Sequence, residues 1–291
     1  DFLVDPDLND IPTDDSISDN AKIRAMSIAK QKDKIELQNK NITSSIEYAS
    51  RIQRAVLPPT DLFKRHLGEH FIFFRPRDIV SGDFNYLNVK NGKIIVAAAD
   101  CTGHGVPGAF MSILSISLMN KVINDLPDDF NAGNILTQLR NEIKIALGQT
   151  GKDNEAKDGL DISLCVLNRK DKFLNYAGAY NPLILIRDHE VIKYKADKMP
   201  IGIYIKEKEE FTNNVIEIQK GDSLYLYSDG FQDQFGGVNK KKFLPKNLNQ
   251  LLLDISSKSV DDQLQILNDT LENWKGEESQ VDDIIILGIK I

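Results

Sequence analysis

In the stretch "KIIVAAADCTGHGVPGAFMSIL", residues 93–114, an apolar run ends at Asp100, passes through a loop with three glycines, and turns apolar again. A run of Ile, Val and Ala is typical of a buried strand, and the apolar segment after the glycines predicts a helix. Aspartate is depleted in strands and common in turns and helix caps. A carboxylate at the end of a buried strand therefore needs an explanation.

Carboxylates occupy the same kind of position elsewhere in the sequence. Asp83 lies in the turn "VSGDF", Asp161 comes directly before "ISLCVLN", Asp229 follows "SLYLYS", and Asp282 and Asp283 precede "IIILGIKI". Each one alone is explained as a turn former. If central strands bring these ends together, two like charges about 4 Å apart repel by roughly 4 kcal/mol at an effective dielectric near 20. The set as a whole therefore predicts a site that binds a cation.

The expected ligands of this cation are oxygen atoms. No cluster of histidine or cysteine accompanies the aspartates, which favours a hard ion such as Mg²⁺ or Mn²⁺ over zinc. The small residues after Asp100 let the backbone approach the ion, so that the carbonyl of Cys101 can serve as a ligand. The N-terminus of the helix that begins near Gly105 would offer amide hydrogens to an anion.

Around this stretch, short runs rich in Ile, Val, Phe and Tyr alternate with turns and predict strands. The expected strands are 70–76, 84–89, 93–99, 162–168, 172–178, 182–187, 214–219, 223–228 and 284–291. Helices are expected at about 105–125, 130–149 and 260–274, and the polar segment 148–159 is predicted to be a mobile loop. Short turns such as "VKNGK" indicate hairpins and a largely antiparallel sheet. The mixed order of elements predicts an α+β layered sandwich.

The N-terminal part has a different character. Residues 1–20 are acidic and rich in turn formers, so we interpret them as a linker. Residues 21–58 lack glycine, and an Ile or Ala recurs every seventh residue from Ile28 to Ala49, which predicts a long amphipathic helix that ends at Pro58. Such a helix either packs along its own domain or pairs in a parallel dimer, and polar residues in its seam would make the dimer weak.

Composition limits the function. The net charge of −7, from 43 acidic and 36 basic residues, argues against a nucleic-acid partner. Two cysteines, Cys101 and Cys165, are too few for a disulfide framework and indicate a reducing compartment such as the cytoplasm. No apolar run approaches the roughly 18 residues of a membrane span. The chain begins with Asp1 rather than Met, so we expect the C-terminal part of a longer sensor protein, for which a membrane anchor stays open.

Six segments carry a family resemblance. In order they are "SGDFNYL", "DCTGHGVPGAFMSIL", "GLDISLCVLN", "LNYAGAYNPLILI", "LYLYSDGFQDQ" and "DDIIILGI". Together they resemble the SpoIIE/RsbU-type branch of the metal-dependent protein phosphatases (the PPM, or type 2C, family), over about residues 70–291. The resemblance implies a β-sandwich of two mainly antiparallel sheets flanked by helices, in α-β-β-α layers, within a phosphatase domain of residues 60–291. The segment "SSIEYASRIQRAVLPP" is similar to the helix that joins such domains to sensor modules.

The resemblance also implies a two-metal centre. In it Asp100 bridges two Mn or Mg ions, and the backbone carbonyl of Cys101 binds one of them. Asp83 is a further metal ligand from the "SGD" turn, while Asp229 and Asp282 complete the ligand set of the second ion. Asp100 and Asp229 are the residues expected to be essential for catalysis.

Other positions are assigned less directly. Asp283 remains an alternative to Asp282 as a ligand, and Asp161 matches a recurring acidic position that would serve a third metal. Arg75 and Arg77 precede the first metal motif and would meet the substrate phosphate as bidentate donors, although exposed charges at a strand edge explain them equally.

The implied reaction is the hydrolysis of phosphoserine or phosphothreonine in a protein by a water activated between two metals. The implied substrate is a phosphorylated anti-sigma-factor antagonist with a STAS domain, and the implied assembly is a homodimer through residues 21–57. Two other classes stay open. One is a catalytically silent signalling module that docks a partner. The other is a nucleotidyl cyclase, for which the sequence offers no recognisable triphosphate site.

Overall fold

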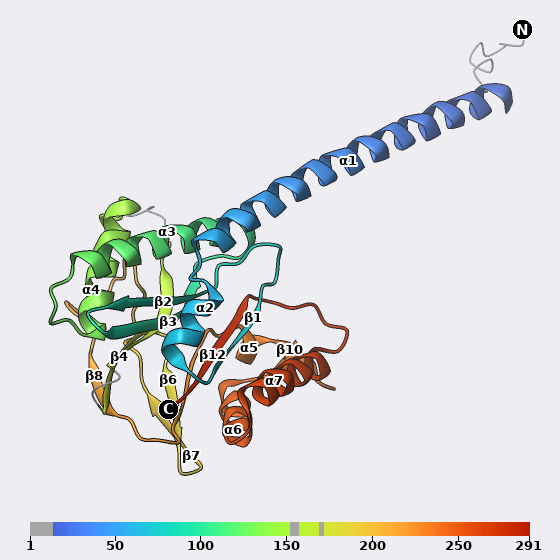
Figure 1. The fold of residues 1–291 in the computed structure, drawn as a ribbon. Coiled ribbons are helices and arrows are strands. Elements are labelled where there is room, and N and C mark those ends of the chain that lie inside the picture. Colours follow the sequence, from blue (N-terminus) through green and yellow to red (C-terminus); the bar gives the residue numbers. More distant parts are fainter. Residues whose placement is uncertain (1–13, 152–156, 169–171) are drawn as a thin grey trace, which may run out of the picture. The chain divides into compact units, whose positions relative to one another are not determined.

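The computed structural model describes residues 14–151, 157–168 and 172–291 (Figure 1). The chain divides into two compact units, Asp1–Tyr48 and Ala49–Ile291. Most of the predicted linker, residues 1–13, lies outside the described residues, as does the centre of the predicted loop 148–159.

A single helix, α1 (Asp14–Val56), makes up the described part of the first unit and ends in the second. It begins at Asp14 and not at the predicted Ala21, so residues 14–20 of the predicted linker belong to the helix. The reason is that the sequence contains no glycine or proline from Asp14 to Leu57, and acidic residues are tolerated in the first turn of a helix. Met26, Ile28, Ile35, Leu37 and Ile42 on this helix are each more than half exposed.

The second unit contains two five-stranded sheets whose strand pairs are all antiparallel. The first sheet has the order β1-β12-β9-β6-β7, with β1 (His70–Arg75), β12 (Ile284–Lys290), β9 (Ser223–Tyr227), β6 (Leu183–Arg187) and β7 (Glu190–Tyr194). The second has the order β2-β3-β4-β5-β8, with β2 (Phe84–Lys90), β3 (Lys93–Cys101), β4 (Leu160–Asn168), β5 (Phe173–Ala179) and β8 (Asn214–Glu217). A small hairpin joins β10 (Phe235–Gly236) to β11 (Lys241–Lys242).

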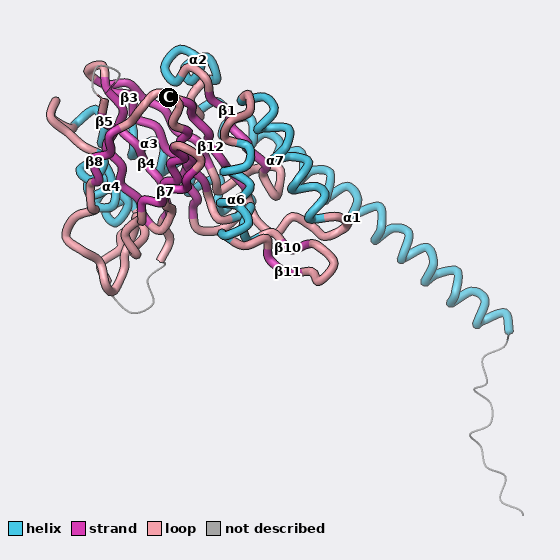
Figure 2. The backbone as a smooth tube through the Cα atoms, turned by 90° about the horizontal axis from the view of Figure 1, so that it is seen from below, coloured by secondary structure: helices cyan, strands magenta, loops and turns pink. Residues whose placement is uncertain are grey.

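Helices cover the outer face of each sheet, as Figure 2 shows with strands in magenta and helices in cyan. The second sheet carries α3 (Gly105–Asp125) and α4 (Ala132–Ala146), and the first carries α6 (Pro245–Ile255) and α7 (Val260–Lys275). Two short helices, α2 (Thr60–Leu67) and α5 (Gly230–Asp233), complete the unit. The predicted α-β-β-α sandwich is confirmed, whereas helices α2, α5 and α6 and strands β7, β10 and β11 were not predicted.

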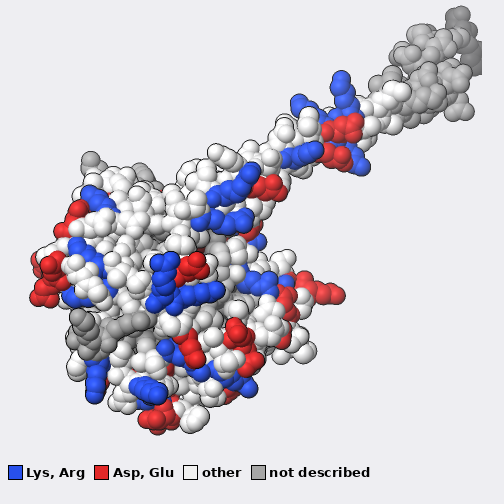
Figure 3. Space-filling view, viewed as in Figure 1, with Lys and Arg blue, Asp and Glu red and all other residues white. Residues whose placement is uncertain are grey.

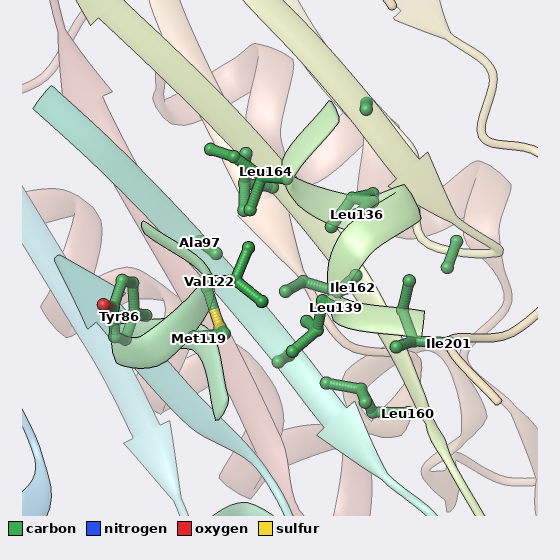
Figure 4. Packing of buried hydrophobic residues seen from close by; sticks show 14 of the residues in the cluster. Tyr86, Ala97, Met119, Val122, Leu136, Leu139, Leu160, Ile162, Leu164 and Ile201 are labelled. Carbon is green, nitrogen blue, oxygen red and sulfur yellow. The ribbon is translucent and has the colours of Figure 1, made fainter. Parts of the chain in front are cut away.

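Strand β3 shows how the sequence pattern builds three core layers. Ile95, Ala97 and Ala99 face α3 and α4, where Met119 and Val122 pack against them (Figure 4). The alternate residues Ile94, Val96 and Ala98 face the other sheet. Both faces of the strand are therefore buried, which explains its continuous apolar sequence. The same alternation places Asp100 on the face turned toward the other sheet, at the strand's end.

One helix of the described chain, α3, is long and apolar enough to span a membrane by length and composition alone. Half of its most apolar window is buried inside the unit, and its buried side chains belong to the core between α3, α4 and the second sheet. A core helix of a globular domain has these same properties.

Candidate metal centre

Four of the predicted aspartates line one cavity of about 360 Å³ at an edge of the sandwich. Asp100 is the last residue but one of β3, Asp161 is the second residue of β4, Asp229 lies between β9 and α5, and Asp282 precedes β12. Cys101, Thr102, Gly103 and His104 line the cavity as well. Segments far apart in the sequence therefore bring carboxylates together, as the pattern of strand ends predicted.

The strand register explains why Asp100 and Asp161 meet. The two residues are directly paired between antiparallel β3 and β4, and paired residues point to the same face of a sheet. Asp229 and Asp282 reach the cavity from the other sheet, in which β9 and β12 are neighbours. The cavity therefore lies where the two sheets meet at their edge.

Asp83 lies at the same place but deeper, with only 2% of its surface exposed. It directly precedes β2, and its Oδ2 accepts a hydrogen bond of 2.6 Å from the hydroxyl of Ser228. Its pKa is raised well above the usual value, first by burial and then by the charges of Asp283 and Asp282. Asp83 thus belongs to the same charged cluster although it does not line the cavity.

The other carboxylates also have raised pKa values. Burial is the main cause of the raised pKa of Asp100, and the charges of Asp83 and Asp229 add to it. Burial and then Asp229 raise the pKa of Asp161 to about 7. The pKa values of Asp229 and Asp282 are raised as well, again mainly by burial. Without a cation, some of these carboxylates must either be protonated or repel one another as charged groups.

Asp283 has a structural task that distinguishes it from Asp282. Its side chain is 2% exposed, its Oδ1 accepts a hydrogen bond of 2.7 Å from the backbone N–H of Arg77, and its Oδ2 accepts one of 2.8 Å from the backbone N–H of Gly82. It therefore ties the turn before Asp83 to the start of β12. Asp282 lines the cavity and Asp283 does not.

Two glycine contacts bring the segments close enough. A Cβ on Gly108, in the first turn of α3, would lie 2.2 Å from the carbonyl oxygen of Gly103 and 2.9 Å from the Cα of Gly82. A Cβ on Gly230 would lie 1.9 Å from the carbonyl oxygen of Asp283. Any side chain at these positions would push the aspartate-bearing segments apart.

The donor set fits hard divalent cations. Among the described residues, no three His, Cys, Asp or Glu side chains already stand grouped as metal ligands. The fit therefore rests on the chemistry of the side chains that line the cavity. The ionisable side chains of the cavity are aspartates and one histidine, and the thiol of Cys101 is buried with a raised pKa, mainly because of burial. These donors suit Mg²⁺ or Mn²⁺ better than zinc.

The two arginines of the prediction have different surroundings. The guanidinium of Arg75 contacts Asn268 and Glu272 on α7 and lies over the ring of Phe73. It does not line the cavity, so the structure does not bring Arg75 to the predicted site. Its contacts with α7 account for it as a structural residue.

Arg77 lies beside the cavity. Its Nη2 is 3.1 Å from Oδ2 of Asp78 and 2.5 Å from Nδ1 of His104, which lines the cavity. Burial raises the pKa of Asp282, and the positive charge of Arg77 acts in the opposite direction. Arg77 is therefore the one of the two arginines that contacts a residue of the cavity.

Sequence reasoning missed two residues that support the centre. Gln53, in the last turn of α1, donates from Nε2 to the carbonyl oxygen of Ser81 at 2.6 Å and to the hydroxyl of Ser112 at 2.7 Å. Ser228 orients Asp83. Neither residue stands in a pattern that marks it, because their partners are distant in sequence, and only the fold identifies them.

The comparisons with known proteins agree with this geometry. The family model of stage II sporulation protein E (SpoIIE) matches residues 90–291. Among solved structures, the SiaA-PP2C domain of Pseudomonas aeruginosa is 31% identical, with 87% of this chain and 98% of that chain covered and a TM-score of 0.78. No relative among curated proteins matches the sequence.

Two further structures are similar in fold. The PP2C phosphatase domain of SpoIIE from Bacillus subtilis, solved with a fragment of its regulatory domain, is 19% identical, with 77% of this chain and 63% of that chain covered and a TM-score of 0.60. The structure of RsbU and RsbW domains from Mycobacterium tuberculosis is 17% identical, with 77% and 60% covered and a TM-score of 0.59.

Proposed function

The chain belongs to the SpoIIE family of PP2C-type protein serine/threonine phosphatases, and from this we propose that it hydrolyses phosphoserine or phosphothreonine in a signalling protein. The family depends on divalent metal ions. The observation that carries the proposal is the cavity of about 360 Å³ lined by four aspartates from four separate segments. Bound cations would neutralise these carboxylates, and the same cations would attract the negatively charged phosphate group of a substrate.

We propose the following ligands. Asp83, Asp100, Asp229 and Asp282, together with the backbone carbonyl of Cys101, would hold two Mn or Mg ions, with Asp100 shared between them. When bound, two such ions lower the pKa of water and stabilise the entering and leaving oxygens of an in-line displacement at phosphorus. The raised pKa values of Asp100 and Asp229 support these assignments, because a cation would relieve the repulsion that contributes to them.

A third ion would be held by Asp161. This residue is paired with Asp100 across β3 and β4, and its side chain lines the same cavity. Asp283 is assigned to positioning, since both of its oxygens accept backbone N–H groups. The guanidinium of Arg77 is a suitable donor for two oxygens of the substrate phosphate, and its contact with His104 supports a place at the rim.

The substrate and assembly are proposed from the family alone. A phosphorylated anti-sigma-factor antagonist with a STAS domain is the proposed substrate, and the cytoplasm is the proposed location. A homodimer through residues 21–57 is supported by the exposed apolar side chains of α1, among them Ile28, Ile35 and Ile42. On the face of the second unit seen in Figure 3, Lys and Arg side chains alternate with Asp and Glu side chains.

The test is hydrolysis of p-nitrophenyl phosphate and of a phosphothreonine peptide with Mn²⁺, with Mg²⁺ and with EDTA. We expect turnover that requires a divalent ion and is reduced at least about a hundredfold by Asp229→Asn, since one ligand of the catalytic centre is lost. The matched control is Asp188→Asn in the exposed β6–β7 turn, where φ is 49° and asparagine is well tolerated.

Two results would refute the proposal. Metal-independent turnover, or full activity of a folded Asp229→Asn variant, would contradict the assigned chemistry. Absence of any phosphatase activity in the presence of Mn²⁺ or Mg²⁺ would favour the silent docking module, and formation of a cyclic nucleotide from ATP or GTP would favour the cyclase.

A further inference from the structure

A second, larger cavity of about 570 Å³ shares Asp161 and Asp229 with the candidate metal centre. On its other side it is lined by three lysines, Lys193, Lys195 and Lys198, and we call this cavity the lysine groove. Lys193 lies on β7, and Lys195 and Lys198 lie in the segment after that strand. The groove thus leads from the metal centre to a basic wall.

The three lysines are exposed, and the carboxylate that lies between two of them in the sequence already has partners. Asp197, between Lys195 and Lys198, is 7% exposed and pairs with Lys208, and its Oδ2 accepts the backbone N–H of Thr212. Within the described residues, none of the three groove lysines forms an ion pair with a carboxylate. Their charges therefore remain available to a bound molecule.

Protection of a sheet edge does not account for all three lysines. β7 is an edge strand, and an exposed lysine such as Lys193 commonly prevents edge-to-edge association. However, β7 ends at Tyr194, so Lys195 and Lys198 lie beyond the paired part of the edge. Their place on the groove wall needs another explanation.

Other features of the lining favour a negatively charged, hydrogen-bonding occupant. Pro245, the first residue of α6, lines the groove, so the positive end of that helix adds to the field of the lysines. Asn181 also lines the groove and is 7% exposed, and its side-chain Nδ2 finds no hydrogen-bond partner among the described residues. Tyr180, beside it, has φ of 53°, which is unusual for a bulky residue.

From this geometry we propose that the lysine groove binds an acidic segment that flanks the phosphorylated residue of the protein substrate. The inference rests on the proposed phosphatase function. A groove that opens at Asp161 and Asp229 can hold chain next to the phosphorylated residue while that residue occupies the metal cavity. The lysines attract the acidic flank, and they give selectivity and a faster encounter more than raw affinity.

The test compares two phosphothreonine peptides of equal length, one with Asp and Glu on both flanks and one with Ser and Gly. We expect the wild-type protein to prefer the acidic peptide by about tenfold in kcat/KM, mainly through KM, since exposed ion pairs are individually weak. The preference should shrink as ionic strength rises. The variant K193Q/K195Q/K198Q should reduce it to about twofold or less, and K193E/K195E/K198E should invert it.

The matched control is K64Q/K220Q/K258Q, which removes the same charge from three exposed lysines that line neither cavity. It should keep the wild-type preference. Equal turnover of both peptides by the wild type, or an unchanged preference in K193Q/K195Q/K198Q, would overturn the groove proposal and leave the phosphatase intact. Failure of the wild type to hydrolyse p-nitrophenyl phosphate or either peptide would instead overturn the proposed function.

Discussion

At the scale of single residues, Asp100 combines two opposing roles. Its position at the end of β3, facing the other sheet, brings its charge close to those of Asp83 and Asp229, and this raises its pKa in addition to the effect of burial. The same closeness is what a bridging ligand requires. Asp100 should therefore lower the free energy of unfolding of the metal-free protein and raise that of the metal-bound protein.

A substitution separates these roles. Asp100→Asn should raise the free energy of unfolding of the metal-free protein by about 1–2 kcal/mol, because one charge of the cluster is removed, and so raise its Tm by about 2–4 °C per kcal/mol. The stabilisation that Mn²⁺ gives the wild type should be largely lost in the variant. Thermal unfolding with EDTA and with Mn²⁺ measures both. A lower Tm in EDTA than that of wild type would contradict this account.

The adjacent residues Asp282 and Asp283 should respond differently to the same change. Asp282→Asn should mainly weaken metal binding, whereas Asp283→Asn should mainly lower the free energy of unfolding, by about 1.5–3 kcal/mol, since it disturbs two charge-assisted backbone hydrogen bonds. Calorimetric titration with Mn²⁺ and denaturant unfolding distinguish the two. If Asp283→Asn keeps full stability but loses metal binding, the roles are reversed.

The residue types of the site were predictable from the sequence, but their roles were only partly so. Asp100, Asp161, Asp229 and Asp282 were found because a carboxylate at the end of an apolar strand is unusual. Local sequence leaves Asp282 and Asp283 equivalent, because only the backbone of distant turns shows which one accepts N–H groups. Arg75 was misplaced for the same reason, since its partner α7 lies near the other end of the chain.

At the scale of elements, nine strands were predictable because their apolar patterns are strong and both faces of several are buried, whereas β7, β10 and β11 are less buried and were missed. α6 was missed since it is short and begins at a proline after a lysine-rich turn. The start of α1 was placed too late because its first residues are acidic, although nothing in them interrupts a helix. Composition was a poorer guide there than the absence of glycine and proline.

The last turn of α1 is joined through Gln53 to the turn that precedes Asp83. Gln53→Ala should lower the free energy of unfolding by about 1–3 kcal/mol, since the buried carbonyl of Ser81 and hydroxyl of Ser112 lose a donor. It should also weaken Mn²⁺ binding, because Ser81 precedes the turn that holds Asp83. Titration with Mn²⁺ and denaturant unfolding measure the two effects.

Lys40→Ala, at an exposed position of the same helix outside the predicted seam, is the control and should change neither quantity. A Gln53→Ala variant with normal metal affinity would show that this contact stabilises the fold without positioning Asp83.

At the scale of the whole molecule, the division at Tyr48 and Ala49 defines where the chain can be shortened. A protein of residues 49–291 keeps Gln53 and should fold with metal-dependent activity, while the full chain should dimerise through α1. Light scattering after size-exclusion chromatography should therefore give a dimer for the full chain and a monomer for 49–291. A dimeric 49–291 would contradict the role of α1.

The apolar positions on α1 allow a sharper comparison. Ile35→Asp lies in the predicted seam and should break the dimer, whereas Leu37→Asp lies on another side of the helix and should not. Both side chains are apolar and exposed, at 55% and 61%, so the two changes differ mainly in position. Equal effects of both would argue against a heptad seam.

The two cavities have a wall in common, formed by Asp161 and Asp229. If ions neutralise that wall, an acidic peptide can settle beside it, and if they are absent the same wall repels the peptide. Occupancy of one site and affinity at the other are then thermodynamically linked, each promoting the other by the same factor. The protein would then retain an acidic substrate only while the metal ions needed for cleavage are bound. Faster dissociation of the acidic peptide after addition of a chelator would demonstrate this linkage.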